Sequence, residues 1–111
     1  MRSRGDMTRE GGPIMVLEIA EYTAQPGKND ELERGLLAGR EIIAAADGCR
    51  SVTLRRCIED ASRFIFTIEW ETLEHHTVHF RGGPQFQEYR NCIAGLYVDP
   101  IVARHYETVS A

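Results

Sequence analysis

Apolar and polar residues alternate along several stretches of the chain, and this alternation predicts β-strands. Residues 63–70 read RFIFTIEW, with Phe64, Phe66, Ile68 and Trp70 in phase with one another. This period of two is typical of a half-buried strand. Similar runs at 14–22 (IMVLEIAEY), 50–58 (RSVTLRRCI) and 101–109 predict three more strands. The short link 59–62 suits a hairpin loop between the second and third strands.

A helical spacing of apolar residues separates the first and second strands. Between residues 28 and 46 the spacing is four, three, four and three, through Leu32, Leu36, Gly39, Ile43 and Ala46. This pattern predicts an amphipathic helix. We expect residues 29–31 to cap its start and Asp47-Gly48 to end it. Gly35 and Gly39 lower the helix propensity, and they either let a sheet or a ligand approach this helix closely or are simply tolerated there.

The segment after the third strand carries three of the four histidines and predicts further helix. Thr72 is a candidate N-cap, Gly82-Gly83 interrupts the helix, and Pro84 suits the first turn of a new one. An apolar stripe follows at Phe86, Tyr89, Ile93, Leu96 and Tyr97, and Asp99-Pro100 ends it. Because Trp70 closes the strand where the histidine segment begins, we expect an aromatic wall close to a titratable ring.

The predicted order of elements is β-α-β-β-α-β. This order is typical of an α+β, ferredoxin-like fold with a four-stranded antiparallel sheet and both helices on one face. We expect one domain over residues 14–111, preceded by a flexible polar leader at 1–13. The uncovered face of the sheet carries apolar residues, so we expect a second copy of the chain to cover it as a homodimer.

Charge and composition exclude several classes of protein. The net charge of −4, with no basic run, argues against binding to nucleic acid. No apolar stretch approaches the roughly 18 residues that a membrane helix needs. The three cysteines, Cys49, Cys57 and Cys92, form no CxxC pair or zinc spacing, so we expect free thiols. We therefore expect a cytoplasmic protein with neither a nucleic-acid nor a membrane partner.

Several short motifs occur in a recognisable order. They are Pro26-Gly27 before the first helix, residues 47–49 (DGC) entering the second strand, and E-W-x-T-x-E-x-x-x-x-H-F over residues 69–80. Pro84 with Phe86 and the closing residues 105–107 (HYE) complete the set. Over residues 14–110 the chain resembles the antibiotic biosynthesis monooxygenase family. This resemblance implies a ferredoxin-like subunit that pairs through its sheet into a dimeric α+β barrel.

The family resemblance implies a range of activities. It includes cofactor-free oxygenases of polycyclic phenols, haem-degrading enzymes, and an isomerase-like branch acting on phosphorylated signalling molecules. We expect a cofactor-independent monooxygenase that uses O2 on a small aromatic or polycyclic substrate. Two alternatives stay open, namely a non-catalytic ligand-binding dimer and an isomerase of a small phosphorylated metabolite. For the isomerase, Arg81 and Arg90 are the candidate phosphate contacts.

The candidate site residues follow from this chemistry. A cofactor-free oxygenase must remove a proton from a phenol or an activated C–H, and a histidine titrating near pH 7 is a suitable base. By resemblance this base is His79. An aromatic face suits a planar substrate, so Trp70 is the predicted wall, and Arg90 is the predicted anion stabiliser. The predicted substrate contacts, in a pocket between sheet and helices, are Tyr22, Phe64, Phe66 and Tyr89.

The histidine-rich segment also raises the question of a metal site. His76 and His79 are three residues apart, whereas His75 and His79 have the better metal spacing of four residues. No third ligand is evident in this segment, and His105 lies in a predicted strand. The sequence therefore predicts no metal site and no cofactor.

Overall fold

The structure is a computed structural model that describes residues 15–110. The leader predicted at 1–13 lies outside the described residues, as do Ile14 and Ala111. The elements are β1 (Val16–Thr23), α2 (Asn29–Ala44), β2 (Cys49–Arg56), β3 (Arg63–Trp70), η1 (His75–Phe80), α3 (Pro84–Ile93) and β4 (Val102–Tyr106). The four strands form one sheet in the order β2-β3-β1-β4, with every neighbouring pair antiparallel. The predicted ferredoxin-like α+β fold is thus confirmed.

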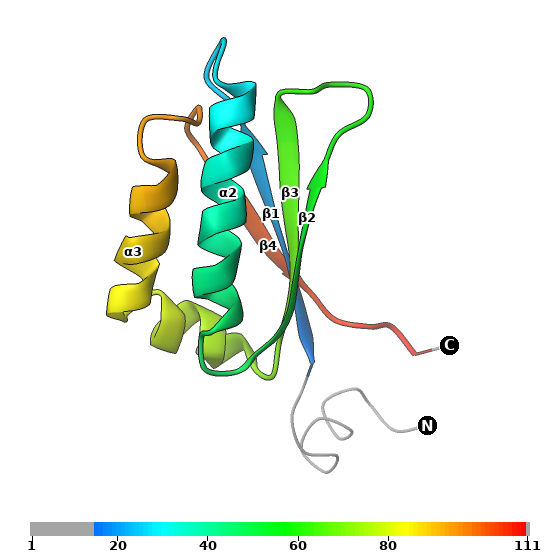
Figure 1. The fold of residues 1–111 in the computed structure, drawn as a ribbon. Helices are drawn as coiled ribbons and strands as arrows, with labels where there is room; N and C mark the ends of the chain where they lie inside the picture. Colours follow the sequence, from blue (N-terminus) through cyan, green and yellow to red (C-terminus); the bar gives the residue numbers. More distant parts are fainter. Residues whose placement is uncertain (1–14, 111) are drawn as a thin grey trace.

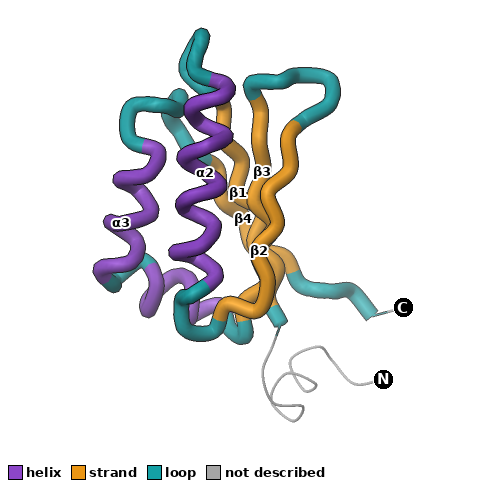
Figure 2. Tube along the Cα trace, viewed as in Figure 1, coloured by secondary structure: helices purple, strands orange, loops and turns teal. Residues whose placement is uncertain are grey.

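The helices cover one face of the sheet and leave the other face bare (Figure 1, Figure 2). Alternate residues of β1 and β3 point under the helices and form the core, as the period-two pattern predicts. Leu32, Leu36 and Ile43 supply the matching stripe from α2. Because both elements bury the face that their sequence pattern marks, the core lies between one sheet and one layer of helices.

Two glycines of α2 allow α3 to pack against it at close range. A Cβ atom on Gly35 would lie 2.4 Å from the carbonyl oxygen of Cys92, and one on Gly39 would lie 3.0 Å from Cδ1 of Tyr89. We expected a sheet or a ligand at these glycines, and that expectation was wrong because the neighbour is α3. The close approach fixes where α3 holds Tyr89.

Two helix ends differ from the prediction. α2 begins at Asn29 without a side-chain cap hydrogen bond and ends at Ala44, before Asp47-Gly48. Gly48 has a φ of +82° and belongs to the turn into β2.

The last helix also stops early, at Ile93. Ala94 leaves the helical conformation with a ψ of 128°, and Gly95 follows with a φ of +77°. The next residues pair with the end of β1 instead, since the backbone N–H of Gln25 donates to Leu96 and Ala24 bridges Tyr97. These tertiary hydrogen bonds outweigh the helical pattern that the stripe suggested.

The histidine segment forms a π-helix, η1, rather than an ordinary α-helix. Thr72 caps the helical segment as predicted, because its Oγ1 accepts a hydrogen bond from the backbone N–H of His75 at 3.3 Å. A π-helix bonds i to i+5, so its turn is wider than 3.6 residues and residues four apart lie nearly above one another. His76 and Phe80 are accordingly both buried, and His79 is exposed.

The bare face of the sheet carries a mixed set of side chains. Leu17 pairs with Tyr106 across β1 and β4, and Ile65 pairs with Glu21 across β3 and β1. Tyr106 is 45% exposed in the single chain. Cys49, Cys57 and Cys92 are free thiols, as predicted. Within residues 15–110, no helix has the length and apolar character needed to span a bilayer.

Candidate functional site

A cavity of about 390 Å³ lies between the sheet and the helices. Its apolar lining comes from Ala20, Ile43, Ile68, Phe80, Phe86, Ile101 and Ala103. Its polar lining comes from Glu18, Tyr22, His76, Arg81, Tyr89 and Arg90. Apolar walls with a few convergent polar groups are typical of a small-molecule site. The cavity therefore occupies the place where the sequence predicts a pocket.

Two buried tyrosines meet in this cavity. Tyr22 from β1 and Tyr89 from α3 are joined by a hydrogen bond between their hydroxyl groups. Burial raises the pKa of Tyr22 well above its usual value, and it raises the pKa of Tyr89 as well. Both phenols are therefore neutral over the ordinary pH range. One hydroxyl hydrogen is used between the two, so the other is free to be donated to a ligand.

A carboxyl group lies on the buried face of β1. Glu18 is 4% exposed, and its Oε1 accepts a hydrogen bond from Nε1 of Trp70 at 2.9 Å. Burial raises the pKa of Glu18 and outweighs the opposing effects of the Trp70 hydrogen bond and the Arg81 charge. A buried carboxyl of this kind can hold a proton that a surface carboxyl would release.

His76 joins Glu18 to a second histidine. Its Nε2 lies 3.4 Å from Oε1 of Glu18, and its Nδ1 is hydrogen-bonded to Nε2 of His105 on β4 at 2.7 Å. The ring of Trp70 stacks on that of His76, with centroids 5.2 Å apart and planes inclined by 17°. The expectation of an aromatic wall beside a titratable ring is thus confirmed.

Burial keeps both of these imidazoles neutral. It lowers the pKa of His76 to about 3, and the positive charge of Arg81 and the neighbouring His105 act in the same direction. Burial and Arg81 likewise lower the pKa of His105. A neutral imidazole has one nitrogen that accepts a proton. An anion bound in the cavity would offset the cost of placing a positive charge there.

Two arginines bring positive charge to the cavity lining. Arg90 is held between aromatic rings, with its guanidinium carbon 5.6 Å from the ring centre of Phe86 and 5.9 Å from that of Tyr97. Its Nη2 donates to the hydroxyl of Tyr97 at 2.8 Å. Arg81 follows directly after η1 and also lines the cavity. The lining therefore favours a ligand that carries or develops negative charge.

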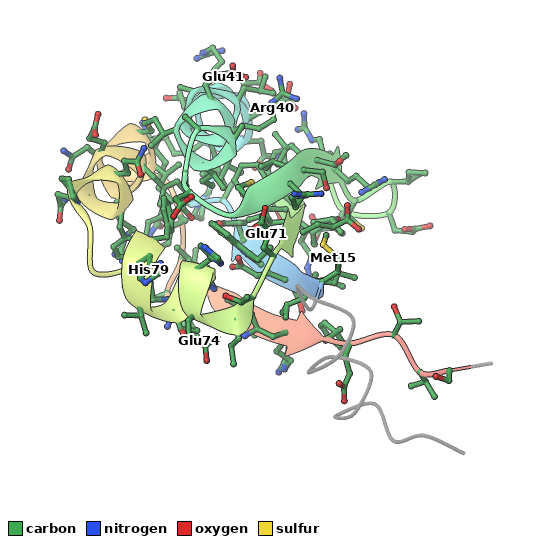
Figure 3. The ribbon with its side chains drawn as sticks, turned by 90° about the horizontal axis from the view of Figure 1, so that it is seen from below. Met15, Arg40, Glu41, Glu71, Glu74 and His79 are labelled. Carbon is green, nitrogen blue, oxygen red and sulfur yellow. The ribbon has the colours of Figure 1, made fainter. Side chains whose placement is uncertain are left out.

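The structure brings together only some of the predicted site residues. Tyr22, Tyr89 and Arg90 line the cavity. Trp70 is fully buried behind His76 and does not line the cavity. It donates a hydrogen bond to Glu18, which does line it. His79 lies on the outer side of η1 and is exposed (Figure 3).

The two phenylalanines predicted to line the pocket also lie outside the cavity lining. Phe66 is buried with its ring edge against Tyr22, 5.7 Å between centroids. Phe64 is buried at the other end of β3, where the guanidinium carbon of Arg56 lies 5.2 Å from its ring centre. Both face the helix layer as the alternation predicts, but Phe64 lines a separate hollow of about 200 Å³ with Glu33, Leu37, Leu54 and Arg56.

Sequence reasoning did not single out Glu18, His76 and His105 as site residues. For Glu18 a signal was present, because it is in phase with Ala20 and Tyr22 on the buried face of the first strand. A carboxylate on an otherwise apolar face rarely occurs without a partner. For His76 the signal was hidden, since an α-helical phase places it with His79, whereas the π-helix separates the two.

Comparison with known proteins identifies the family. The family model of the antibiotic biosynthesis monooxygenases matches residues 15–91. The uncharacterized protein YczJ of Bacillus subtilis is 30% identical over 95 residues, which span 86% of this chain and all of that protein.

Solved structures agree with this match. A candidate antibiotic biosynthesis monooxygenase from Bordetella bronchiseptica is 34% identical, with a TM-score of 0.81 over 87% of this chain and 99% of the other. SnoaB, a cofactor-independent oxygenase from Streptomyces nogalater, has the same fold, with a TM-score of 0.76 over 88% of this chain and 96% of that one, at 14% identity. The chain belongs to the antibiotic biosynthesis monooxygenase family.

Proposed function

We propose that this protein is a cofactor-independent monooxygenase that oxidises a small aromatic or polycyclic phenolic substrate with O2. The observation that carries the proposal is the cavity in which apolar and aromatic walls meet the Tyr22–Tyr89 pair, His76 and Arg90. Membership of the family and the likeness of fold to SnoaB, described as a cofactor-independent oxygenase, support it.

The reaction balances without an external reductant. An anthrone-type substrate loses a proton from its activated CH2 group, and the resulting electron-rich anion reduces O2. One oxygen atom forms the new carbon–oxygen double bond of the quinone, and the other leaves as water with the two hydrogens of the CH2 group. The substrate supplies all four electrons, so the protein needs only to bind it, accept a proton and stabilise negative charge.

The tyrosine pair and Arg90 suit the last of these tasks. The free hydroxyl hydrogen of the Tyr22–Tyr89 pair is positioned to donate to an oxygen anion that develops on the substrate. Because the pKa of each phenol is raised, this hydrogen is retained at the pH at which a substrate loses its own proton. Arg90 adds a fixed positive charge that its aromatic neighbours hold in place.

His76 is our candidate proton acceptor, because it is the histidine that lines the cavity. Its Nδ1 is hydrogen-bonded to His105, so Nε2, which lies 3.4 Å from Oε1 of Glu18, would take up the proton. Because its pKa in the folded protein is about 3, it can act as a base only when a bound anion raises that pKa. His79 was the acceptor expected from the family resemblance, and its exposed position outside the lining argues against direct contact with a substrate. Variants at His76 and at His79 distinguish the two possible proton acceptors.

The test is O2 uptake by metal-free protein with a panel of anthrones, hydroquinones and flavonoid-like phenols. We expect uptake above the uncatalysed rate, at least 100-fold lower in His76→Gln, about 10-fold lower in Tyr89→Phe, and within twofold of wild type in His79→Gln. Loss of uptake in His79→Gln with full activity in His76→Gln would return the role to His79. No uptake with any compound would remove the oxygenase proposal.

A second candidate is an isomerase of a small phosphorylated metabolite, favoured by Arg81 and Arg90 in the cavity lining. It predicts that inorganic phosphate competes with ligand binding and that Arg81→Gln weakens this competition. Saturable binding of neutral aromatics without O2 uptake or phosphate competition would instead indicate a non-catalytic binding protein.

We also propose that the bare sheet face pairs two copies of the chain. The apolar side chains on this face support the pairing, namely Leu17, Ile19, Ile65, Val102 and Tyr106. Ile19→Glu would place a charge near the centre of such an interface. Sedimentation should show a dimer for wild type and a monomer for Ile19→Glu, and a wild-type monomer at micromolar concentration would end this proposal.

A further inference from the structure

We propose that Asp47, His75 and His79 form a binding site for a divalent transition metal such as Zn²⁺, on the outer side of η1 and separate from the cavity. One ligand atom from each residue lies within 4.8 Å of the others. Nε2 of His75 and Oδ2 of Asp47 are 3.7 Å apart. Two ligand atoms on a tetrahedral zinc ion are about 3.4 Å apart, given bonds of about 2.1 Å, so a small adjustment closes the site.

The π-helix brings the two histidines together. His75 and His79 are four residues apart, and the wide turn of η1 places their rings on one side with centroids 5.3 Å apart. Two imidazoles and one carboxylate form a ligand set that zinc accepts and that calcium or magnesium does not prefer. The remaining coordination position would be filled by water, because Asp47 and His79 are exposed.

Thr72 orients the central histidine for this role. Its Oγ1 is 2.8 Å from Nδ1 of His75, and it also accepts the backbone N–H of the same residue at 3.3 Å. With Nδ1 occupied by Thr72, Nε2 is left to face Asp47. Metal-binding histidines commonly have their second ring nitrogen held by a protein group in this way. The side chain of His75 is only 18% exposed, so its orientation is also fixed by packing.

Gly48 brings the acidic ligand within reach. A Cβ atom on Gly48 would lie 2.2 Å from Cγ of His75, closer than any side chain permits. The absence of a side chain here, together with the φ of +82°, lets the turn that carries Asp47 press against the histidine ring. The third ligand, which the histidine segment itself lacks, therefore comes from the turn between α2 and β2.

The other histidine cluster of the described chain is less suited to a metal. Nδ1 of His76 and Nε2 of His105 are 2.7 Å apart, a hydrogen-bond distance that is shorter than the separation of two zinc ligands. Glu18 is already bonded to Trp70. Hydrogen bonds close this inner cluster, whereas the outer cluster has its ligand atoms at a spacing that a cation would bridge.

A metal in the outer site would connect two segments that are distant in sequence. It would join the α2–β2 turn to η1, the element whose inner side supplies His76 and Phe80 to the cavity. Because the unfolded chain does not hold these ligands together, binding would stabilise the folded protein by an amount that grows with the logarithm of the metal concentration once this exceeds the dissociation constant. This role is independent of the proposed oxygenase activity.

The test is Zn²⁺ affinity of tag-free, metal-stripped protein, measured by competition with a chromophoric chelator. We expect one equivalent bound by wild type and affinity at least 10-fold weaker in Asp47→Asn and in His79→Gln. Glu74→Gln is the matched control, because Glu74 is an exposed acid on the same segment and is not one of the three ligands (Figure 3). His105→Gln is the control for the inner cluster, and both controls should bind as wild type does.

Two further measurements test the same site. Saturating Zn²⁺ should raise the melting temperature of wild type and of Glu74→Gln but not of His79→Gln, and Co²⁺ should give tetrahedral absorption bands in the same two proteins. Circular dichroism of each metal-free variant checks that it is folded. Absence of binding to wild type, unchanged affinity in Asp47→Asn and His79→Gln, or loss of binding in His105→Gln alone would overturn the proposal.

Discussion

His76 and His79 lie three residues apart on η1, yet they belong to two different surroundings. His76 is 4% exposed, stacks on Trp70 and is bonded to His105, whereas His79 is exposed and contacts only the edge of His75 among the described rings. The inner side is closed by hydrogen bonds between buried groups. The outer side has polar atoms spaced more widely and open to water. One helical segment thus presents two sets of imidazoles whose chemistry is set by burial rather than by residue type.

The free energy of unfolding should separate the two sides most strongly. His76→Ala removes the hydrogen-bond partner of His105 and one of the two buried neighbours of Glu18, which keeps its bond to Trp70, and it opens a gap beside Trp70, so we expect a loss of about 2 to 3 kcal/mol. His79→Ala, at an exposed position, should change stability by less than about 0.5 kcal/mol. Urea unfolding of both variants measures the difference, and equal losses would contradict the contrast drawn here.

The pH dependence of stability is the next largest effect. The pKa of His76 is about 3 in the folded protein and 6.5 when unperturbed, so between these values the unfolded chain takes up a proton that the folded chain does not. Stability should therefore fall as pH is lowered from about 6.5, by at most about 1.4 kcal/mol per pH unit from this residue.

Glu18 acts in the opposite direction, because its raised pKa favours the folded state at low pH and this contribution is lost as pH rises through the folded pKa. The comparison of wild type with His76→Gln isolates the histidine part. Urea midpoints measured from pH 4 to pH 7.5 should vary less in His76→Gln than in wild type or in His79→Gln. Parallel curves for all three proteins would show that His76 is not the group responsible.

Gly48→Ala should disturb only the outer side of η1, where His75 and His79 lie. The positive φ and the contact with the ring of His75 both oppose a side chain there, and we expect a loss of about 1 to 2 kcal/mol. The same variant should bind Zn²⁺ more weakly, since His75 must move. Gly27→Ala is the control for the effect of positive φ alone, because Gly27 also has a positive φ but no atom lies within 4 Å of the added Cβ.

Thr72→Ala should change stability less than Gly48→Ala does, by about 0.5 to 1 kcal/mol for the lost cap. Its informative effect is on the metal, where loss of the group that orients His75 should weaken Zn²⁺ binding about 10-fold. Thr72→Ser retains the hydroxyl and should restore wild-type affinity. If Thr72→Ala binds Zn²⁺ as wild type does, the orienting role is excluded.

The sequence predicts the fold well because its signals are local and repeated. Alternation in the strands and the stripe of α2 place Tyr22 and Leu36 on the buried side, and the structure agrees. The end of α3 was predicted too late, because pairing between Leu96 and Gln25 competes with the helix and is not visible in the local pattern.

The candidate site was only partly predictable for a related reason. Tyr89 and Arg90 were accessible to sequence reasoning as polar groups on a helix beside the core. The choice between His76 and His79 depends on helix phase, which the π-helix changes by a fraction of a turn. His75 and Asp47 are 28 positions apart in the sequence, and only the folded backbone brings them together.

The π-helical turn of η1 also bears on how such proteins diversify. A π-helix can arise from an α-helix by insertion of a single residue, and deletion of one residue would restore the tighter turn. Such a change would turn the helical residues after it by about 100° relative to those before it, and so alter which imidazoles face the interior and which face the solvent. In this architecture a one-residue insertion or deletion is therefore an evolutionary route between an internal and an external use of the same histidines.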